Sequence, residues 1–174
     1  QVLRRGMDLV RDVAEEATND DVFIVGCGMP LTTGIGTVDA MRVGPDTGGY
    51  WIERKGKLLR TGAMVGVRNS IRNSVVRGHM HRALWLNDPD CLMLRTKGTR
   101  LSPAQRRTQI NAIALTGGLL LYSDDFSELD RETLAEISQI QAIAGECFAG
   151  RLIPLDMMAH ELPRIVLNTA GYLG

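Results

Sequence analysis

The first residues of the chain mix apolar and charged side chains at close to helical spacing. The apolar positions are Val2, Leu3, Met7, Leu9, Val10, Val13, Ala14 and Ala17. Because this spacing places apolar side chains along one side of a helix, it predicts a helix over residues 1–17. The pair Asn19-Asp20 ends the pattern, and the uninterrupted apolar run at 22–25 predicts a buried strand of a parallel sheet.

Short apolar runs and helical patterns continue to alternate along the chain. The further strands that we expect cover residues 37–42, 83–86 and 119–122. The further helices that we expect cover about 63–77, 102–115 and 130–144. Ser102-Pro103 and Asp130 have the chemistry of helix starts. Strands that alternate with helices imply an α/β protein with a parallel sheet, and the segments 151–155 and 165–167 indicate β structure after it.

Composition excludes several classes of protein. Twenty basic residues balance twenty acidic ones, which argues against nucleic acid or an acidic membrane as a partner. No apolar run reaches transmembrane length. The cysteines Cys27, Cys91 and Cys147 are odd in number and widely spaced, so we expect neither a disulfide scaffold nor a zinc knuckle. Free thiols favour a cytoplasmic location. The sequence opens without Met inside a helical pattern, so we expect the true N-terminus to lie upstream.

Acidic residues gather where the predicted strands end. They are Asp39, Asp46, Asp88, Asp90, Asp124 and Asp125. In α/β barrels the chemistry sits at the carboxyl ends of strands, and retaining glycoside hydrolysis needs two carboxyl groups about 5–5.5 Å apart. One carboxylate attacks the anomeric carbon, while the other protonates the leaving oxygen and then activates water. The pattern offers several candidates for such a pair.

Longer motifs at the same places carry a resemblance to a known family. They cover residues 23–31, 38–46, 50–51, 80–92, 115–118 and 123–125, and include Cys27-Gly28, Arg42-x-x-x-Asp46 and Asn87-Asp88-Pro89-Asp90. Together they span about residues 4–145 and resemble the glycoside hydrolase family 36 α-galactosidases, the melibiases. The Arg-x-x-x-Asp and Asn-Asp-Pro-Asp motifs also occur in the related family 27 α-galactosidases.

The resemblance implies a fold, an organisation and an activity. Residues 1–145 would be the second half of a (β/α)₈ TIM barrel, about strands five to eight with their helices. Residues 146–174 would start a C-terminal β domain or form a tail. The parent protein would be a retaining α-galactosidase without metal or other cofactor. Its substrates would be oligosaccharides with terminal α-galactose, such as melibiose, raffinose-type oligosaccharides and galactomannan side chains. The resemblance also leaves room for a homo-oligomer of the full-length protein.

Roles for single residues follow from the matched motifs. The resemblance makes Asp46 the general acid/base and places Arg42 in the galactose site, in contact with the sugar and the catalytic carboxylates. The residues that would line or border the sugar pocket are Cys27, Gly28, Asp90 and Cys91. The family nucleophile, an Asp in a Lys-x-Asp motif on strand four, has no counterpart here, so we expect the chain alone to be inactive.

Each assignment has a structural alternative. Asp46 could close a Gly-Pro-Asp turn, Arg42 could belong to a structural ion pair, and Cys27 could be a small buried apolar residue. We expect Asp88 to tie its loop together. We expect residues 123–125 to cap the last barrel helix and the barrel rim.

Two further features invite other functions. His79-x-His81 suggests a metal site, but the matched enzymes need no metal, so none is expected. The arginines between residues 60 and 82 form a basic helix face that we expect to meet solvent. For the whole protein, the rival interpretations are another α-glycosidase of the clan, such as an α-N-acetylgalactosaminidase, and a non-catalytic sugar-binding or assembly protein.

Overall fold

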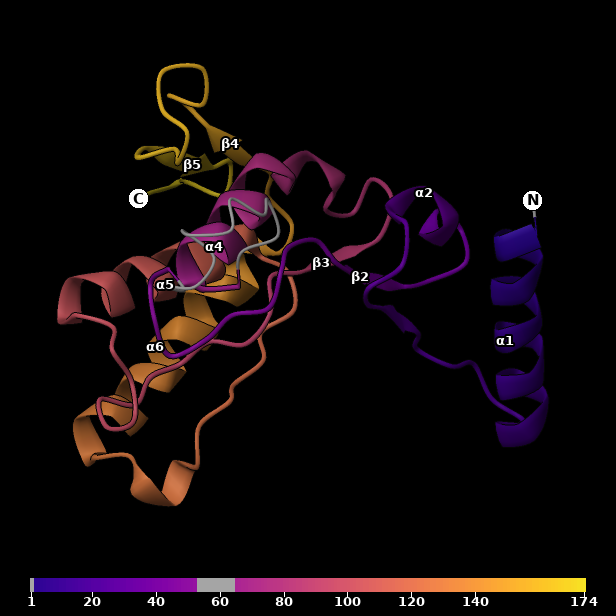
Figure 1. Ribbon diagram of the computed structural model, residues 1–174, viewed down its shortest axis with the longest axis horizontal. Coiled ribbons are helices and arrows are strands. Elements are labelled where there is room, and N and C mark those ends of the chain that lie inside the picture. The colour runs from indigo at the N-terminus through magenta and orange to yellow at the C-terminus, as the bar shows by residue number, and fades with distance from the viewer. Residues whose placement is uncertain (1, 53–64) are drawn as a thin grey trace.

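The computed structural model of the chain describes residues 2–52 and 65–174. Its helices and strands, in chain order, are α1 (Val2–Thr18), β1 (Val25–Gly26), α2 (Leu31–Gly34), β2 (Ala40–Arg42), α4 (Val67–Val76), η1 (Gly78–Met80), β3 (Leu86–Asp88), α5 (Pro103–Thr116), η2 (Phe126–Glu128), α6 (Arg131–Cys147), β4 (Leu152–Pro154), β5 (Val166–Asn168) and β6 (Tyr172–Leu173). Figure 1 shows α1 at one end of the molecule, α2 and a short sheet in the middle, and α4 to α6 at the other end beside a second sheet.

The first sheet consists of short parallel strands in the order β1-β2-β3. Val25 of β1 pairs with Ala40 of β2, and Arg42 at the end of β2 pairs with Asp88 at the end of β3. Helix α4 lies in the connection between β2 and β3, as parallel pairing requires. The predicted parallel sheet is confirmed for these strands, and their carboxyl ends share one edge.

The observed strands differ in their bounds from the predicted ones. The run at 22–25 contributes only Val25 to β1, because the ladder to β2 begins with hydrogen bonds from Asp39 N and Ala40 N to Ile24 O. The prediction that this run is buried is also wrong, since Val25 is 43% exposed. Among the described strands β1 pairs with β2 alone, so it is an edge strand.

The third strand lies later in the chain than predicted. Residues 82–84 form a turn, closed by a hydrogen bond of 2.7 Å from Arg82 N to Trp85 O, and only Leu86 of the predicted run 83–86 belongs to β3. The strand itself continues through Asn87 and Asp88, which we expected to end it. Pairing with β2 therefore overrides the local turn chemistry of these two polar residues.

The segment 119–122 is not the regular fourth strand that the sequence predicts. Tyr122 makes an isolated parallel bridge to Leu92, and Leu119 N donates to Asn87 O at 2.9 Å. The segment thus runs beside β3 and its continuation. Gly118 permits this close approach, because a Cβ there would lie 2.3 Å from Asn87 O.

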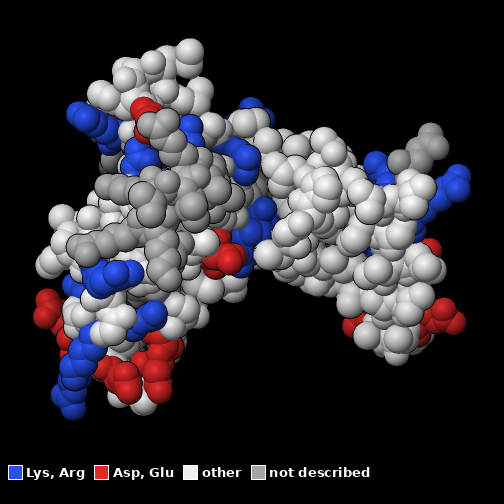
Figure 2. All heavy atoms as spheres, in the orientation of Figure 1, with Lys and Arg blue, Asp and Glu red and all other residues white. Residues whose placement is uncertain are grey.

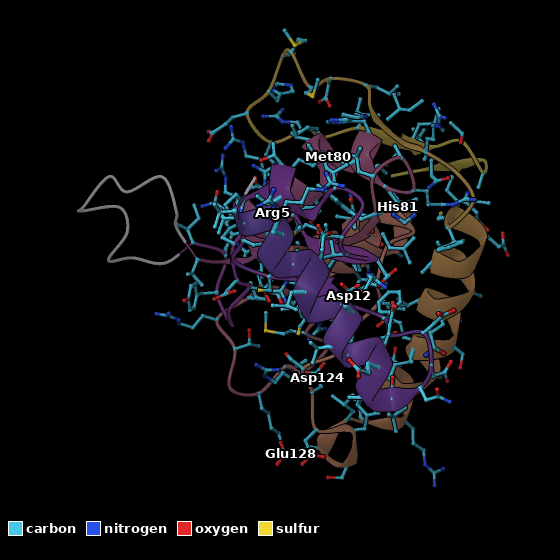
Figure 3. All side chains as sticks on the ribbon, turned by 90° about the vertical axis from the view of Figure 1, so that its right-hand side faces the viewer. Arg5, Asp12, Met80, His81, Asp124 and Glu128 are labelled. Carbon is cyan, nitrogen blue, oxygen red and sulfur yellow. The ribbon has the colours of Figure 1, made fainter. Side chains whose placement is uncertain are left out.

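The predicted first helix is confirmed as α1, which ends where Asn19 adopts a φ of 52°. Its apolar stripe is largely exposed, with Leu3 and Leu9 each 62% exposed. Arg11 attaches the helix to the sheet, since its Nη2 lies 2.7 Å from Asp39 Oδ2. Figure 3 looks at the molecule from this end, with α1 nearest the viewer.

Capping residues start the later helices as predicted. Ser102 and Gln105 form a reciprocal capping box at the start of α5, and Gly117 ends α5 in the left-handed conformation. Asp130 accepts a hydrogen bond from Thr133 N at the start of α6. Helix α4 is confirmed from Val67 onward. Its predicted start near residue 63, and Arg60 of the predicted basic face, lie outside the described residues.

The second sheet is antiparallel, in the order β4-β5-β6, and confirms the β segments predicted after the last helix. Leu152 and Val166 pack in one buried cluster with residues of α4 and α5. Asn168 Nδ2 donates to Leu115 O at 2.9 Å and to Cys147 O at 3.1 Å. This amide therefore ties the sheet to the carboxyl ends of α5 and α6.

The surface carries charges of both signs. Figure 2 shows Lys and Arg interspersed with Asp and Glu over α4 to α6, and few charged side chains over α2 and the first sheet. Across residues 2–52 and 65–174, no helix is both long and apolar enough to cross a membrane. The same residues contain no group of three or more His, Cys, Asp or Glu side chains placed to hold a metal ion.

Candidate active site

The guanidinium of Arg42 brings together carboxylates at the carboxyl ends of β2 and β3. Its Nε lies 2.9 Å from Asp88 Oδ2, its Nη2 3.2 Å from Asp90 Oδ1, and its Nη1 3.4 Å from Asp46 Oδ1. The Arg-x-x-x-Asp and Asn-Asp-Pro-Asp motifs, which are far apart in the sequence, therefore meet at one cation. A guanidinium suits this position because its donors form a rigid planar fork.

Strand register and a tight loop create this arrangement. Arg42 and Asp88 are partners in the parallel ladder. Asp90 has a φ of 75°, a conformation that Asp tolerates better than most side chains. Asp88 Oδ1 accepts a hydrogen bond of 2.8 Å from Asp90 N, so Asp88 ties its loop together as predicted. Ser70 Oγ of α4 also holds the loop, donating to Pro89 O at 2.7 Å.

Both oxygens of the Asp90 carboxylate are engaged by donors of the protein. Oδ1 faces Arg42 and accepts from Cys91 N at 2.7 Å. Oδ2 accepts from Thr47 N at 2.5 Å and from Thr47 Oγ1 at 3.1 Å. Thr47 is absent from the predicted site residues. Its position directly after Asp46 is the one sequence signal that could have pointed to it.

The carboxylates around Arg42 differ in solvent access. The side chains of Asp88 and Asp90 are 1% and 8% exposed, whereas that of Asp46 is 74% exposed. A carboxyl group can exchange a proton with a substrate only if the substrate can reach it. Asp88 and Asp90 are therefore buried counter-ions of Arg42, and Asp46 is the member of this cluster that is open to chemistry.

Burial and hydrogen bonding set the protonation of two groups at the site. Burial lowers the pKa of the Arg42 guanidinium, but the hydrogen bond with Asp88 and the charges of Asp88 and Asp90 outweigh it and leave the pKa raised. Burial, followed by a hydrogen bond with Asp90, raises the pKa of the Cys91 thiol to about 11. Arg42 is thus a cation and Cys91 a neutral thiol at physiological pH.

Cys27 and Gly28 follow β1 on the same edge of the sheet. The Cys27 thiol is exposed, so the alternative of a small buried apolar residue is wrong. Cys27 lies within electrostatic range of the Arg42 guanidinium. Gly28 has a φ of 68°, and no atom lies within 4 Å of the position that a Cβ would take. The backbone beside Gly28 is therefore open to an approaching ligand.

Asp39 lies apart from the Arg42 cluster. Its Oδ2 lies 2.7 Å from Arg11 Nη2 and accepts from Ile24 N at 2.8 Å. Burial acts to raise the pKa of Asp39, but the hydrogen bonds from Ile24 and Arg11 outweigh it and leave the pKa below its ordinary value. This ionised carboxylate serves to hold α1 against the sheet.

The Ser-Asp-Asp motif does not cap the last helix, so that prediction is wrong. The side chain of Asp124 is fully buried, accepts from Leu94 N at 2.6 Å and pairs with Arg95 Nη1 at 2.9 Å. Asp125 accepts from Ser127 N and caps η2. The N-cap of α6 is Asp130, because the short helix η2 intervenes between the motif and α6.

The two histidines of the His-x-His pattern do not converge on a common point. His81 is buried and accepts from Asn87 N at 3.2 Å through its Nδ1. Burial lowers the pKa of the His81 imidazole, which favours its neutral form. His79 is exposed, with its Nδ1 3.2 Å from Val76 O.

No family model matches the sequence, but solved structures match the fold. TtGalA, an α-galactosidase from Thermus thermophilus in complex with p-nitrophenyl α-D-galactopyranoside, matches with a TM-score of 0.73 and 26% identity. The match covers 96% of this chain and 31% of TtGalA. TtGalA in complex with stachyose matches with a TM-score of 0.70 and 30% identity, over 79% of this chain and 29% of that one.

A fungal enzyme shares the fold at lower identity. α-Galactosidase I from Mortierella vinacea matches with a TM-score of 0.64 and 16% identity, over 95% of this chain and 47% of the fungal chain. The chain thus spans less than a third of TtGalA in either complex and less than half of the fungal enzyme. It has an α-galactosidase-like fold, which confirms the resemblance found in the sequence.

Proposed function

From this α-galactosidase-like fold, we propose that the chain is a segment of a retaining α-galactosidase that hydrolyses terminal α-galactosides by double displacement. The observation that carries the proposal is the geometry of Asp46. It is an exposed carboxylate 3.4 Å from a guanidinium that two buried carboxylates already neutralise. The substrates would be oligosaccharides with a terminal α-galactose, such as melibiose, raffinose-type oligosaccharides and galactomannan side chains.

The proposal includes a placement of the chain within the parent protein. Residues 1–145 would supply about strands five to eight of a (β/α)₈ barrel, and residues 146–174 would begin a C-terminal β domain. The sheet order β1-β2-β3, which follows the chain, supports the first part. The change to antiparallel pairing in β4-β5-β6 supports the second.

Asp46 is the general acid/base of the proposed reaction. In the first step its proton passes to the glycosidic oxygen, while a nucleophilic carboxylate bonds to the anomeric carbon and the alcohol leaves. In the second step the Asp46 carboxylate takes a proton from water, and the water oxygen displaces the enzyme carboxylate. The nucleophile would come from outside these 174 residues, since they contain no Lys-x-Asp motif.

The proposed galactose pocket lies beside this acid. Arg42 would orient both the sugar and the carboxylates through its planar fork. The open backbone at Cys27 and Gly28 would let a hexose approach closely. Asp90 and Cys91 would border the pocket on the side of β3.

The test is a comparison of kcat/KM in the full natural polypeptide that contains this chain. We expect aryl α-galactoside to be preferred over aryl α-glucoside and over aryl α-N-acetylgalactosaminide. We expect the 174-residue chain alone to show no turnover above a heat-inactivated control. Equal efficiency on the glucoside or the acetylated sugar would defeat the galactosidase assignment. Sugar binding without hydrolysis by the full polypeptide would favour a non-catalytic protein.

A further inference from the structure

The carboxylate of Asp90 faces donors of the protein with both of its oxygens. A carboxylate offers about four lone-pair positions. Oδ1 receives Cys91 N at 2.7 Å and Arg42 Nη2 at 3.2 Å. Oδ2 accepts from Thr47 N at 2.5 Å and lies 3.1 Å from Thr47 Oγ1, whose single proton can go to this oxygen or to Cys91 O at 3.3 Å. A sugar hydroxyl would compete with these donors for the Asp90 oxygens.

We infer that Asp90 is a positioning residue for Asp46, and that it acts by clamping the backbone and hydroxyl of Thr47. This inference rests on the proposed function, in which Asp46 is the general acid/base. It gives Asp90 a task that requires no contact with the sugar. It also gives Thr47 a positioning role in the active site, and this role requires no contact of Thr47 with the substrate or with the proton that Asp46 transfers.

The loop that carries Asp46 is held on both sides of that residue. On one side Gly66 N donates to the Asp46 carbonyl oxygen at 3.0 Å. On the other side Asp90 holds Thr47, and the Asp90 carboxylate is fixed in turn by Arg42. The Asp46 side chain itself is 74% exposed, and within residues 2–52 and 65–174 its one polar side-chain contact is with Arg42 at 3.4 Å. Its direction therefore depends mainly on the backbone beneath it.

The same geometry explains why Asp occupies position 90. The φ of 75° at Asp90 is uncommon for a residue with a side chain, although Asp and Asn adopt it more readily than others. Asn would suit the backbone equally well. It could not replace the carboxylate, however, because one of its two polar atoms is a donor and every partner of Asp90 also donates.

Loss of the clamp should affect one part of the reaction selectively. A general acid works within about 2.6–3.2 Å of the oxygen that it protonates. A shifted loop would misplace the proton of Asp46 without changing the pocket that binds galactose. Substrates with poor leaving groups need the proton, whereas activated aryl galactosides need it far less.

The experiment compares Thr47→Val, Thr47→Ser and Asp90→Asn in the full natural polypeptide. For each variant we would measure kcat/KM on melibiose and on an activated aryl α-galactoside, together with the inhibition constant of free galactose. We expect Thr47→Val and Asp90→Asn to lose about tenfold to a hundredfold on melibiose and much less on the aryl substrate. Thr47→Ser should restore the melibiose rate, and galactose inhibition should stay within about twofold in both Thr47 variants.

Two controls separate the clamp from general damage. Thr108→Val makes the same chemical change on the exposed surface of α5, and it should leave the ratio of the two rates at the wild-type value. Asp46→Ala gives the change in the ratio of the two rates that complete loss of the proton donor causes. If Asp90→Asn fails to fold, the comparison of Thr47→Val with Thr47→Ser still decides the matter.

Several outcomes would overturn the inference. Weaker galactose binding with an unchanged ratio of rates would make Asp90 a sugar ligand. Equal losses on both substrates, or no rescue by Thr47→Ser, would make the clamp merely structural. If Asp46→Ala itself shows no dependence on the leaving group, the proposed function fails and the inference falls with it. If Asp46→Ala shows that dependence while Thr47→Val does not, the inference alone is wrong.

Discussion

Arg42 Nε and Asp88 Oδ2 lie 2.9 Å apart across two neighbouring parallel strands, at positions that are partners in the ladder. The Asp88 side chain is 1% exposed, so its charge is balanced inside the protein rather than by water. One guanidinium therefore supports the sheet and the candidate active site at once. Changes at Arg42 should consequently affect stability as well as chemistry.

Arg42→Met should destabilise the full natural polypeptide strongly. The variant leaves the buried carboxylates of Asp88 and Asp90 without their cation, and breaking a buried pair in this way costs about 3–5 kcal/mol. Urea denaturation should show the loss as a lower free energy of unfolding. The same change at the exposed Arg5 of α1 is the control and should cost less than about 0.5 kcal/mol. Equal stability of the two variants would mean that water already compensates the buried carboxylates.

Gly118→Ala and Gly145→Ala should change stability in opposite directions. A Cβ at Gly118 would lie 2.3 Å from Asn87 O, a backbone atom that cannot move without displacing β3. We expect a cost of about 1–3 kcal/mol. A Cβ at Gly145, inside α6, would meet nothing within 4 Å, so Ala there should stabilise the protein by about 0.5–1 kcal/mol. The midpoint of urea denaturation measures the stability of both variants. A stabilising effect of Gly118→Ala would contradict the close packing of Gly118 against Asn87.

Alkylation should distinguish the cysteines at neutral to mildly alkaline pH. Only the thiolate reacts, and the pKa of Cys91 is raised to about 11 by burial and by its hydrogen bond with Asp90. Burial also raises the pKa of Cys147, whereas Cys27 is exposed. We expect iodoacetamide at about pH 8 to modify Cys27 first, as measured by mass spectrometry of the folded protein. Modification of Cys91 at the same rate would show that its thiol is more accessible than its surroundings imply.

Asp46→Ala should separate the role of acid/base from that of nucleophile. On substrates with poor leaving groups the rate should fall by about 10²–10⁴-fold, since the proton donor is lost. On an activated aryl α-galactoside the glycosyl-enzyme should still form and then accumulate. Azide needs no deprotonation, so it should rescue turnover.

The product of that rescue assigns the residue. Attack by azide on the glycosyl-enzyme gives the α-galactosyl azide, which NMR identifies by its anomeric configuration. A β-azide would instead mean that Asp46 is the nucleophile. An unchanged rate on natural oligosaccharides would mean that Asp46 takes no part in the reaction.

The helices could be predicted well because their ends are local chemistry. Ser102, Gly117 and Asp130 act on backbone groups within a few residues of themselves. The strands could not be predicted as well, because each is only two or three residues long and is defined by its partner. Asn87 and Asp88 look like turn residues in the sequence and become part of β3 only beside β2.

The residues of the candidate site also differ in how far the sequence could predict them. Arg42, Asp46 and Asp90 belong to motifs that could be recognised in the sequence. The contact between Thr47 and Asp90 joins residues 43 positions apart, and Thr47 has no chemistry of its own that would single it out. The orientation of the Asp90 oxygens toward donors of the protein also depends on tertiary structure, so the local sequence could not indicate it. The sequence could therefore indicate which side chains belong to the site, but not which carboxylate oxygens already bind donors of the protein.

The separation of Arg42 and Asp88 along the sequence also determines the order in which the site is synthesised. Asp88 lies 46 residues after Arg42, which corresponds to roughly 2–9 s of ribosomal synthesis at about 5–20 residues per second. For most of that interval Asp46 has already been made, whereas Asp88 and Asp90, the carboxylates that will pair with the guanidinium, have not. Asp46 thus leaves the ribosome before Asp88 and Asp90, and the active-site loop can settle only after β3 and the loop that follows it have been translated.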